Sequence, residues 1–298
     1  MAGSNLTFRV ATSHTRWNLP IRSAGHLKPK HFGFRPMLAA AICTFSTAAQ
    51  ADLPLAVEGL LTDRGEVKLD LSLTYNNSAG EILENRDAVI GTAALRYGLT
   101  GKMDLYGRAS YLYTSARGMG FTTGNTYHAT NHRFVDSWLG MSYRIKDDNT
   151  TPALIGFAET ALLEKGQKSN SSFHSWAAGI TTYKSIDPIV FILSVYYSIN
   201  LPRKDSGLTV NPGNTFTLNP SIAFSVNDRV TLNTGVRWTN AWPSHYEGQT
   251  QYFRRTNTDL QLGVDYGFSN DDILNVTFSS NVSGTNGTSL RFDWLHTF

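Results

Sequence analysis

The chain has 298 residues, of which 16% are charged and 12% are aromatic, and its formal net charge is +3. The positive excess lies in residues 1–51, which contain six basic residues and no acidic one, so the remaining 20 basic and 23 acidic residues give −3. That balance offers no support for nucleic-acid binding. A helical membrane span is excluded because no uninterrupted run of about 18 apolar residues occurs.

Residues 1–51 are predicted to be an extended secretory signal segment that is cleaved. A basic stretch, 1–36, precedes a small and apolar stretch, 37–51, that ends in Ala-Gln-Ala. This order is typical of a signal peptide. An Arg-rich mitochondrial presequence is the competing interpretation, and the apolar stretch argues against it. The single cysteine, Cys43, lies in this segment, so the mature chain has no thiol for a disulfide or a metal site, and we expect no cofactor.

After a short periplasmic segment, 52–64, the chain is predicted to form twelve strands. In 65–75 the apolar residues Leu69, Leu71 and Leu73 alternate with polar ones, the period of a strand with one apolar face. Similar stretches, near the roughly 9–11 residues with which a tilted strand crosses hydrocarbon, are 88–97, 103–115, 134–145, 152–163, 173–183, 189–197, 215–226, 229–239, 256–268, 273–282 and 289–298. The facing of the fifth to seventh strands stays open.

The connections between these strands alternate in length. Short turns follow the even-numbered strands, and generally longer polar loops follow the odd-numbered ones. A soluble β-sandwich gives no reason for this alternation, whereas an outer-membrane barrel has short periplasmic turns and long external loops. The predicted fold is therefore all-β, a transmembrane antiparallel up-and-down β-barrel of about twelve strands over 65–298, in a bacterial outer membrane. Such a sheet must close, because an unpaired backbone amide finds no water in lipid.

The last strand is expected to carry an insertion signal. Leu290, Phe292, Trp294 and Phe298 fall on one face, and the aromatic C-terminus resembles the signal by which outer-membrane barrels are recognised. Trp294 and Phe298 are therefore candidate contacts for the barrel-assembly machinery, and outer-membrane lipid and lipopolysaccharide are the expected surroundings. The aromatic residues expected at the two membrane interfaces are Tyr75, Tyr97, Tyr113, Trp238 and Trp294.

Charged residues on the inward strand faces are expected to line the lumen. The candidates are Arg96, Asp104, Arg108, Asp136, Arg144, Arg237, Asp259, Asp265, Arg291 and Asp293. Opposed charges tune the selectivity of an open pore, but they also pair in a small barrel filled by side chains, and the sequence leaves both interpretations open. Closure brings the last strand to the first, so we expect an ionic contact across this seam between Arg291 or Asp293 and Lys68 or Asp70.

Three short stretches resemble the outer-membrane protein family associated with the meta-pathway of phenol degradation. They are 95–100 (LRYGLT), 140–144 (GMSYR) and 152–156 (PALIG); the Pro-Thr-Gly step that often follows the family's fifth strand is replaced by 163–167 (LEKGQ). The resemblance implies a transporter or channel for small, often hydrophobic compounds. The expected function is therefore passage of small solutes, including hydrophobic or aromatic compounds, through a charged lumen.

Two alternatives stay open. An outer-membrane lipase would need His and Ser on one strand face, but His174 and Ser175 are adjacent and so point to opposite faces. For a protease, His132 with Asp136 is the nearest approach to a catalytic pair. A structural or secretion barrel would need a plug, for which the segment 52–64 is the candidate. His128 and His132 give only a weak metal-site pattern, because they lie in a predicted loop.

Overall fold

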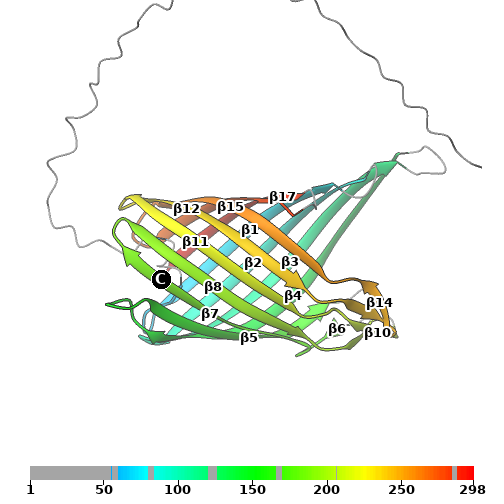
Figure 1. Cartoon of the computed structure of the whole chain (residues 1–298), viewed down its shortest axis with the longest axis horizontal. Coiled ribbons are helices and arrows are strands. Elements are labelled where there is room, and N and C mark those ends of the chain that lie inside the picture. Colours follow the sequence, from blue (N-terminus) through cyan, green and yellow to red (C-terminus); the bar gives the residue numbers. More distant parts are fainter. Residues whose placement is uncertain are drawn as a thin grey trace, which may run out of the picture. The chain divides into compact units, whose positions relative to one another are not determined.

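Twelve long antiparallel strands close into a barrel, which confirms the predicted fold (Figure 1). The computed structural model describes Leu55 and residues 60–79, 84–119, 126–165, 170–205, 207–283 and 287–298. The expected signal segment, residues 1–51, lies outside the described residues. No helix within the described residues has the length and apolarity needed to cross a membrane.

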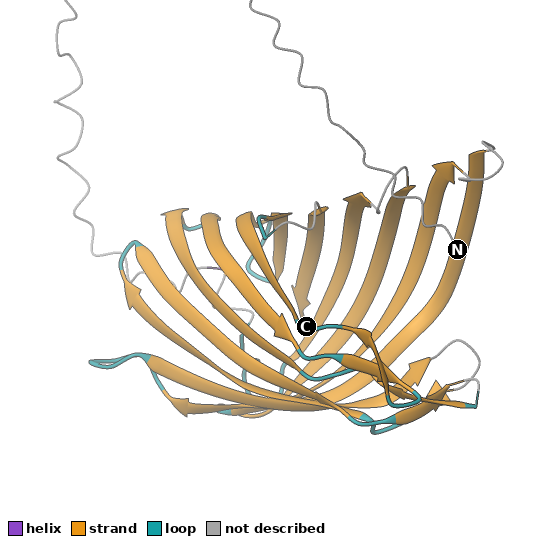
Figure 2. Cartoon of the chain, turned by 45° about the vertical axis from the view of Figure 1, so that its right-hand side comes forward, coloured by secondary structure: helices purple, strands orange, loops and turns teal. Residues whose placement is uncertain are grey.

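The strands of the wall match the twelve predicted stretches. They are β1 (Val67–Ala79), β2 (Glu84–Thr100), β3 (Met103–Met119), β4 (Thr126–Lys146), β5 (Ala153–Lys165), β7 (Ser175–Ile186), β8 (Ile189–Asn200), β11 (Thr215–Asn227), β12 (Val230–Ala241), β15 (Arg255–Gly267), β16 (Asp272–Asn281) and β17 (Gly287–Thr297). The short strand β6 (Asn170–Ser171) extends β5. Figure 2 shows the strands side by side around the wall, with the loops gathered at their ends.

The seam between the first and last strands closes the barrel. β1 pairs with β17 from Lys68–Thr297 to Ser78–Gly287. The amide of Phe298 donates to the carbonyl of Val67 at 2.9 Å, so the C-terminal residue itself extends the seam. Both ends of the barrel chain therefore lie at the end that carries the short turns, which we call the turn end; the opposite end is the loop end.

The loop end has more strand than the sequence predicts. The expected loop 116–133 is mostly strand, because β3 runs to Met119 and β4 begins at Thr126, forming the long hairpin at the upper right of Figure 1. The expected loops 198–214 and 240–255 contain β9 (Arg203–Asp205), β10 (Leu208–Asn211), β13 (Ser244–Tyr246) and β14 (Gln249–Tyr252), which form a separate four-stranded sheet. Strands outside the hydrocarbon have water on both faces, so they lack the apolar alternation on which the prediction rested.

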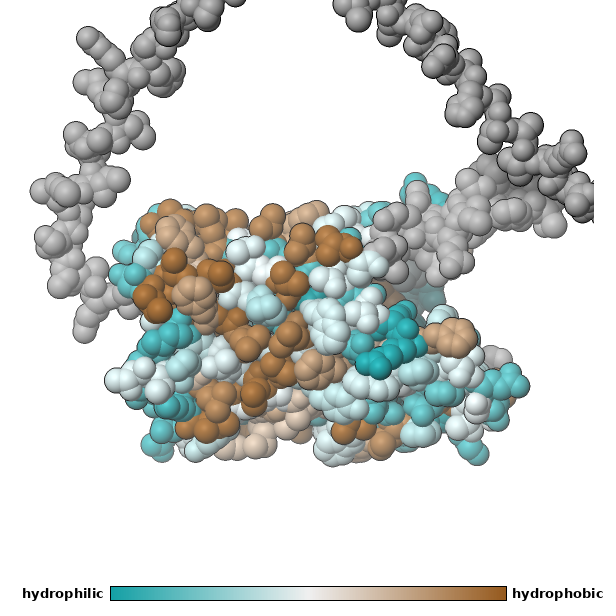
Figure 3. Space-filling view, viewed as in Figure 1, coloured by the Kyte–Doolittle hydropathy of each residue, from teal (hydrophilic) through white to brown (hydrophobic). Residues whose placement is uncertain are grey.

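The outer face of the wall is apolar. Leu73 and Leu262 are exposed, whereas Lys68 and Asp265 on the inner faces of the same strands are buried. Apolar side chains gather on the face of the barrel wall that Figure 3 shows. Of the aromatic residues expected at the interfaces, Tyr75, Tyr97, Tyr113 and Trp294 are exposed on this face.

The structure also settles the three strands of open facing. On β5, Ala153 and Ile155 are buried in the lumen, and on β7 Trp176 and Ile180 are exposed to the outside. On β8, Val190 is buried while its neighbour Phe191 is exposed. The inner face of these strands is thus unusually apolar at the turn end, which is why alternation along the sequence could not distinguish the two sides.

That apolar inner face packs against residues 60–66, which we call the lumen-crossing segment. Leu61 belongs to one buried cluster with Ala153, Ile155, Tyr183, Val190 and Ala223, from β5, β7, β8 and β11. On the other side of the lumen, Lys68 Nζ of β1 donates to the carbonyl of Leu61 at 3.0 Å. Because β1 and β8 lie on opposite sides of a twelve-stranded ring, the segment passes from one wall to the other.

Gly98 of β2 makes the close approach of this segment possible. The amide of Gly65 donates to the carbonyl of Gly98 at 2.8 Å, and the amide of Gly98 donates to the carbonyl of Glu66 at 3.1 Å. A Cβ atom at Gly98 would lie 1.8 Å from the carbonyl oxygen of Asp63. Leu60, Leu61 and Thr62, expected as part of a periplasmic segment, therefore lie inside the turn end of the barrel, whereas Asp63 and Arg64 are exposed.

Candidate functional site: a cavity in the lumen

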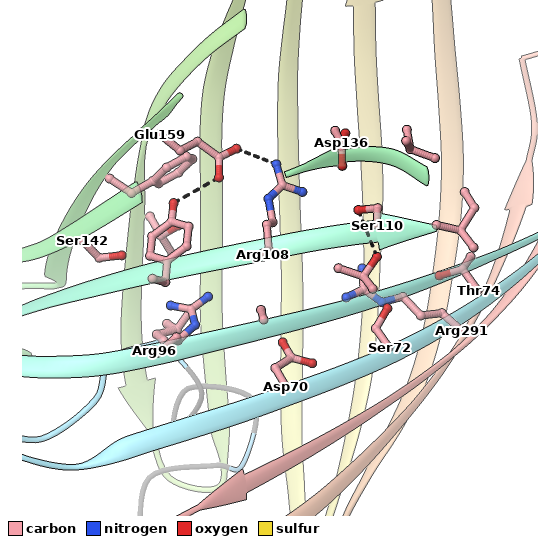
Figure 4. Close-up of a pocket in the computed structure, with 18 of the residues that line it drawn as sticks. Asp70, Ser72, Thr74, Arg96, Arg108, Ser110, Asp136, Ser142, Glu159 and Arg291 are labelled. Atoms are coloured by element: carbon pink, nitrogen blue, oxygen red, sulfur yellow. Dashed lines mark hydrogen bonds and ion pairs between the residues drawn. The ribbon is translucent and has the colours of Figure 1, made fainter. Parts of the chain in front are cut away.

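A cavity of about 640 Å³ lies in the lumen above Leu60 of the lumen-crossing segment. Its lining comes from β1, β2, β3, β4, β5, β7 and β17 (Figure 4). The residues are Leu60, Asp70, Ser72, Thr74, Ile90, Thr92, Ala94, Arg96, Tyr106, Arg108, Ser110, Leu112, Val135, Asp136, Ser142, Ile155, Phe157, Glu159, Thr181 and Arg291. The lining thus combines guanidinium groups, carboxylates, hydroxyl groups and apolar side chains.

A row of three residues organises the charged wall. Tyr106 of β3 pairs with Gly140 of β4, and Gly140 pairs with Glu159 of β5. A Cβ at Gly140 would lie 2.4 Å from Cζ of Tyr106, so the tyrosine ring lies over the glycine. The Tyr106 hydroxyl donates to Oε2 of Glu159 at 3.2 Å, and Nη2 of Arg108 donates to Oε1 at 2.9 Å (Figure 4). Glu159 therefore joins β3 to β5 across the intervening strand.

Two arginines of this wall stack on aromatic rings. Cζ of Arg96 lies 4.9 Å from the centroid of Tyr106, and Cζ of Arg108 lies 4.9 Å from the ring of Trp138. Arg96 also lies 3.8 Å from the fully buried carboxylate of Asp104. Stacking and ion pairing hold both guanidinium groups in place, since each side chain is restrained by a face and by an opposite charge.

A second row repeats the arrangement further around the barrel. Phe157 of β5 pairs with Gly179 of β7, which pairs with Tyr196 of β8. A Cβ at Gly179 would lie 2.6 Å from Cβ of Tyr196 and 2.7 Å from the ring of Phe157. The two rings meet over the glycine with centroids 6.4 Å apart. Glycine on an inner face thus lets large rings lie across a strand instead of filling the lumen.

The predicted lumen residues fall into three groups by their place in the barrel, apart from Asp293, which pairs with Arg291. Arg96, Arg108, Asp136 and Arg291 line the cavity, and Asp104 is buried behind Arg96. Arg144 pairs with Asp147 at 3.4 Å at the turn end.

The third group lies on the wall formed by β12, β15 and β16. Arg237 is the cross-strand partner of Asp259, and Asp259 accepts from Nδ2 of Asn281 at 2.8 Å. Asp265, almost fully buried, accepts from Nδ2 of Asn233 at 2.7 Å and from Asn275. Both aspartates therefore accept hydrogen bonds from asparagine side chains.

At the seam between β1 and β17, the four charged candidates Lys68, Asp70, Arg291 and Asp293 lie at four different positions along the strands, so none is directly opposite another. Asp70 is opposite Leu295, Lys68 is opposite Thr297, and Asp293 is opposite Ser72. Arg291 pairs with Asp293 of its own strand at 2.6 Å. An ionic contact across the seam therefore stays a prediction. Asp70 and Asp293 are diagonal neighbours that repel each other, so the opposite charge available to Asp70 on β17 is Arg291.

Several site residues were missed by the sequence reading. Glu159 and Trp138 had no assigned role, the first because β5 shows apolar residues on both faces. At the loop end, Oγ of buried Ser175 lies within hydrogen-bond distance of two acceptors, Oε1 of Glu164 at 2.8 Å and Oδ1 of Asn200 at 2.9 Å. Arg203 pairs with Glu164 at 2.7 Å. These contacts hold Arg203, the first residue of β9, against the inside of the barrel. Only the strand registers bring these residues together.

Comparison with solved structures supports the architecture. The COG4313 outer membrane channel from Pseudomonas putida F1 superposes with a TM-score of 0.65 and 12% identity, covering 80% of this chain and 97% of that one. The likeness is one of fold. The KdgM porin (TM-score 0.46, 10% identity, 77% and 99% covered) and the CymD monoaromatic hydrocarbon channel (0.39, 9%, 79% and 91%) are more distant. No protein-family model matches the sequence, and no curated protein is significantly similar to it.

The outer-membrane barrel fold predicted from the strands and their connections is thus confirmed. A closed twelve-stranded barrel with an apolar outer face and a polar interior is the architecture of a bacterial outer-membrane protein. The location predicted from the alternating loops agrees with it.

Proposed function

We propose that the protein is an outer-membrane channel for small solutes and has no enzymatic activity. The observation that carries the proposal is the cavity of about 640 Å³ inside the closed barrel. Its size is in the range of small-molecule sites, roughly 300–1,000 Å³. Apolar residues such as Ile90, Leu112 and Phe157 lie in the same lining as the charged wall. This mixture favours solutes with an apolar body, including aromatic compounds, that also carry a polar group.

The lumen-crossing segment sets the resting state of this channel. Leu61 and Thr62 are buried at the turn end, and Leu60 forms part of the cavity floor. The purified barrel should therefore conduct weakly, and removal of 52–64 should enlarge the conductance steps. Recordings in planar bilayers with both proteins make the test. If neither protein gives steps above the bare bilayer, the channel proposal is wrong.

The contacts of the candidate catalytic residues disfavour the enzyme alternative. The hydroxyl of Ser175 bonds to Glu164 and Asn200, whereas Nδ1 of His174 contacts the carbonyl of Ser172. A register shift at Val135 lies between His132 and Asp136: His132 is opposite Tyr113 of the outer face, and Asp136 is opposite buried Ser110. The two residues suggested for a protease pair thus lie on opposite faces.

We also propose the partners expected from the sequence: lipid and lipopolysaccharide around the barrel, and the assembly machinery at β17. Trp294 and Phe298 are exposed on the outer face of that strand. Changing Phe298 to Ala should lower the yield of folded barrel in outer-membrane fractions, while Phe268→Ala, at an exposed turn, serves as the control. Equal yields for both variants would remove the role of Phe298.

A further inference from the structure

In three ion pairs of the lumen, the two partners differ in how much of the side chain is exposed. The side chain of Arg96 is 25% exposed and that of its partner Asp104 is 0% exposed. For Arg108 and Glu159 the values are 34% and 12%, and for Arg291 and Asp293 they are 48% and 19%. In each pair the arginine is the more exposed partner, although Glu159 also lines the cavity. The more accessible side of these three pairs is therefore the cationic one.

The three arginines come from three different rows of the wall. Through the strand registers, Arg291 lies in the row of Thr74, Arg108 in the row of Asp70, and Arg96 in the row of Lys68. These rows lead from the loop end toward the lumen-crossing segment. We call Arg96, Arg108 and Arg291 the arginine track.

Besides Glu159, two carboxylates outside these pairs line the cavity, and one oxygen of each is turned away from it. Oδ1 of Asp70 and Oδ1 of Asp136 are each shielded from solvent and have no hydrogen-bond partner among the described residues. Asp70 lies on β1 between β2 and β17, the strands that carry Arg96 and Arg291 (Figure 4). One oxygen of each carboxylate is thus shielded, whereas the side chains of Arg96, Arg108 and Arg291 are 25%, 34% and 48% exposed.

We propose that the arginine track binds small organic anions: a carboxylate is held by its guanidinium groups while an apolar body rests against Ile155 and Phe157. A planar guanidinium presents paired donors that match a carboxylate. Rigid stacking of Arg96 and Arg108 keeps these donors in position before the anion arrives. The proposal names the solute class of the channel proposed above, but binding itself is measurable without conduction.

The test is calorimetric titration of the detergent-solubilised protein with benzoate. Benzyl alcohol and benzylammonium, which share the ring but differ in charge, are the matched ligands. Benzoate should bind at least about tenfold more tightly than either, as expected for hydrogen bonds to a charged group. Equal binding of the three compounds would overturn the proposal.

Substitutions test whether benzoate binds at the arginine track. Arg291→Gln should weaken benzoate binding about tenfold, and so should R291Q/D293N, which removes the pair without changing net charge. Arg229→Gln, at an exposed turn, should leave it unchanged, and heat-modifiable migration on gels shows that each variant is folded. If R291Q/D293N binds benzoate like the wild type, net charge and not the exposed guanidinium controls binding, and the proposal fails.

Conductance separates this inference from the channel proposal. In a potassium chloride gradient, the reversal potential of the wild type should show anion preference, reduced in Arg291→Gln. Benzoate binding with silent bilayers would reject the channel and keep the anion site. Conductance without anion preference or benzoate binding would reject the anion site and keep the channel.

Discussion

Nη2 of Arg108 lies 2.9 Å from Oε1 of Glu159, although their strands, β3 and β5, are separated by β4. The contact exists because Gly140 occupies the row between Tyr106 and Glu159 and leaves the inner face of β4 clear. A residue without a side chain therefore decides whether the charged wall forms.

Gly140→Ala should break this wall. The new Cβ would meet the Tyr106 ring at 2.4 Å, so the ring must swing into the lumen and lose its hydrogen bond to Glu159. We expect a loss of about 1–3 kcal/mol of stability, as for overpacked cores, together with smaller conductance steps. Thermal unfolding and bilayer recording measure both effects. Gly107→Ala, whose Cβ would make only an ordinary contact at 3.7 Å, should behave like the wild type.

Gly98→Ala should displace the lumen-crossing segment. The added methyl group cannot share space with the Asp63 carbonyl oxygen, 1.8 Å from its position, so the segment must leave β2. Conductance should rise toward that of the protein lacking 52–64. The control is Gly91→Ala on the same strand, where no atom lies within 4 Å of the new Cβ. Unchanged conductance in Gly98→Ala would show that the segment does not restrict the pore.

Arg203→Gln should loosen the loop-end sheet. Its guanidinium pairs with Glu164 at 2.7 Å, and both side chains are largely buried, so the change leaves a carboxylate without its partner. Such a loss costs about 3–5 kcal/mol for a buried pair, and less here because both groups keep some contact with water. Limited proteolysis should then cut within 201–214 at lower protease concentrations. Arg255→Gln, at an exposed arginine of the loop end, provides the comparison.

Charge reversal at Asp70 tests the seam. Asp70 lies on the lumen side between β2 and β17, which carry Arg96 and Arg291, so a lysine at this position would face two guanidinium groups. Asp70→Lys should weaken closure of β1 on β17 and lower the temperature at which the folded band disappears on a semi-native gel. An unaltered transition would count against an ionic contribution across the seam.

The strands were predictable because lipid imposes a period-two pattern on β1, β3 and β15. The inward positions of Arg108 and Asp265 follow from that pattern alone. Glu159 was not predictable, since β5 buries apolar residues on its inner face against Leu61. The role of Gly140 depends on the register of three strands, which no local pattern determines. The lumen-crossing segment is too short to show a period of its own.

The two glycine rows have a mechanical consequence. Each row contains a contact between strands that are not neighbours, Tyr106–Glu159 in the first and Phe157–Tyr196 in the second. Together these contacts stiffen the part of the wall formed by β3, β4, β5, β7 and β8. Bending of the wall there requires breaking a contact that spans two inter-strand spacings at once. As the barrel fluctuates, this part of the wall should keep its curvature. The distances between the charged side chains that it carries should therefore vary less than the diameter of the pore.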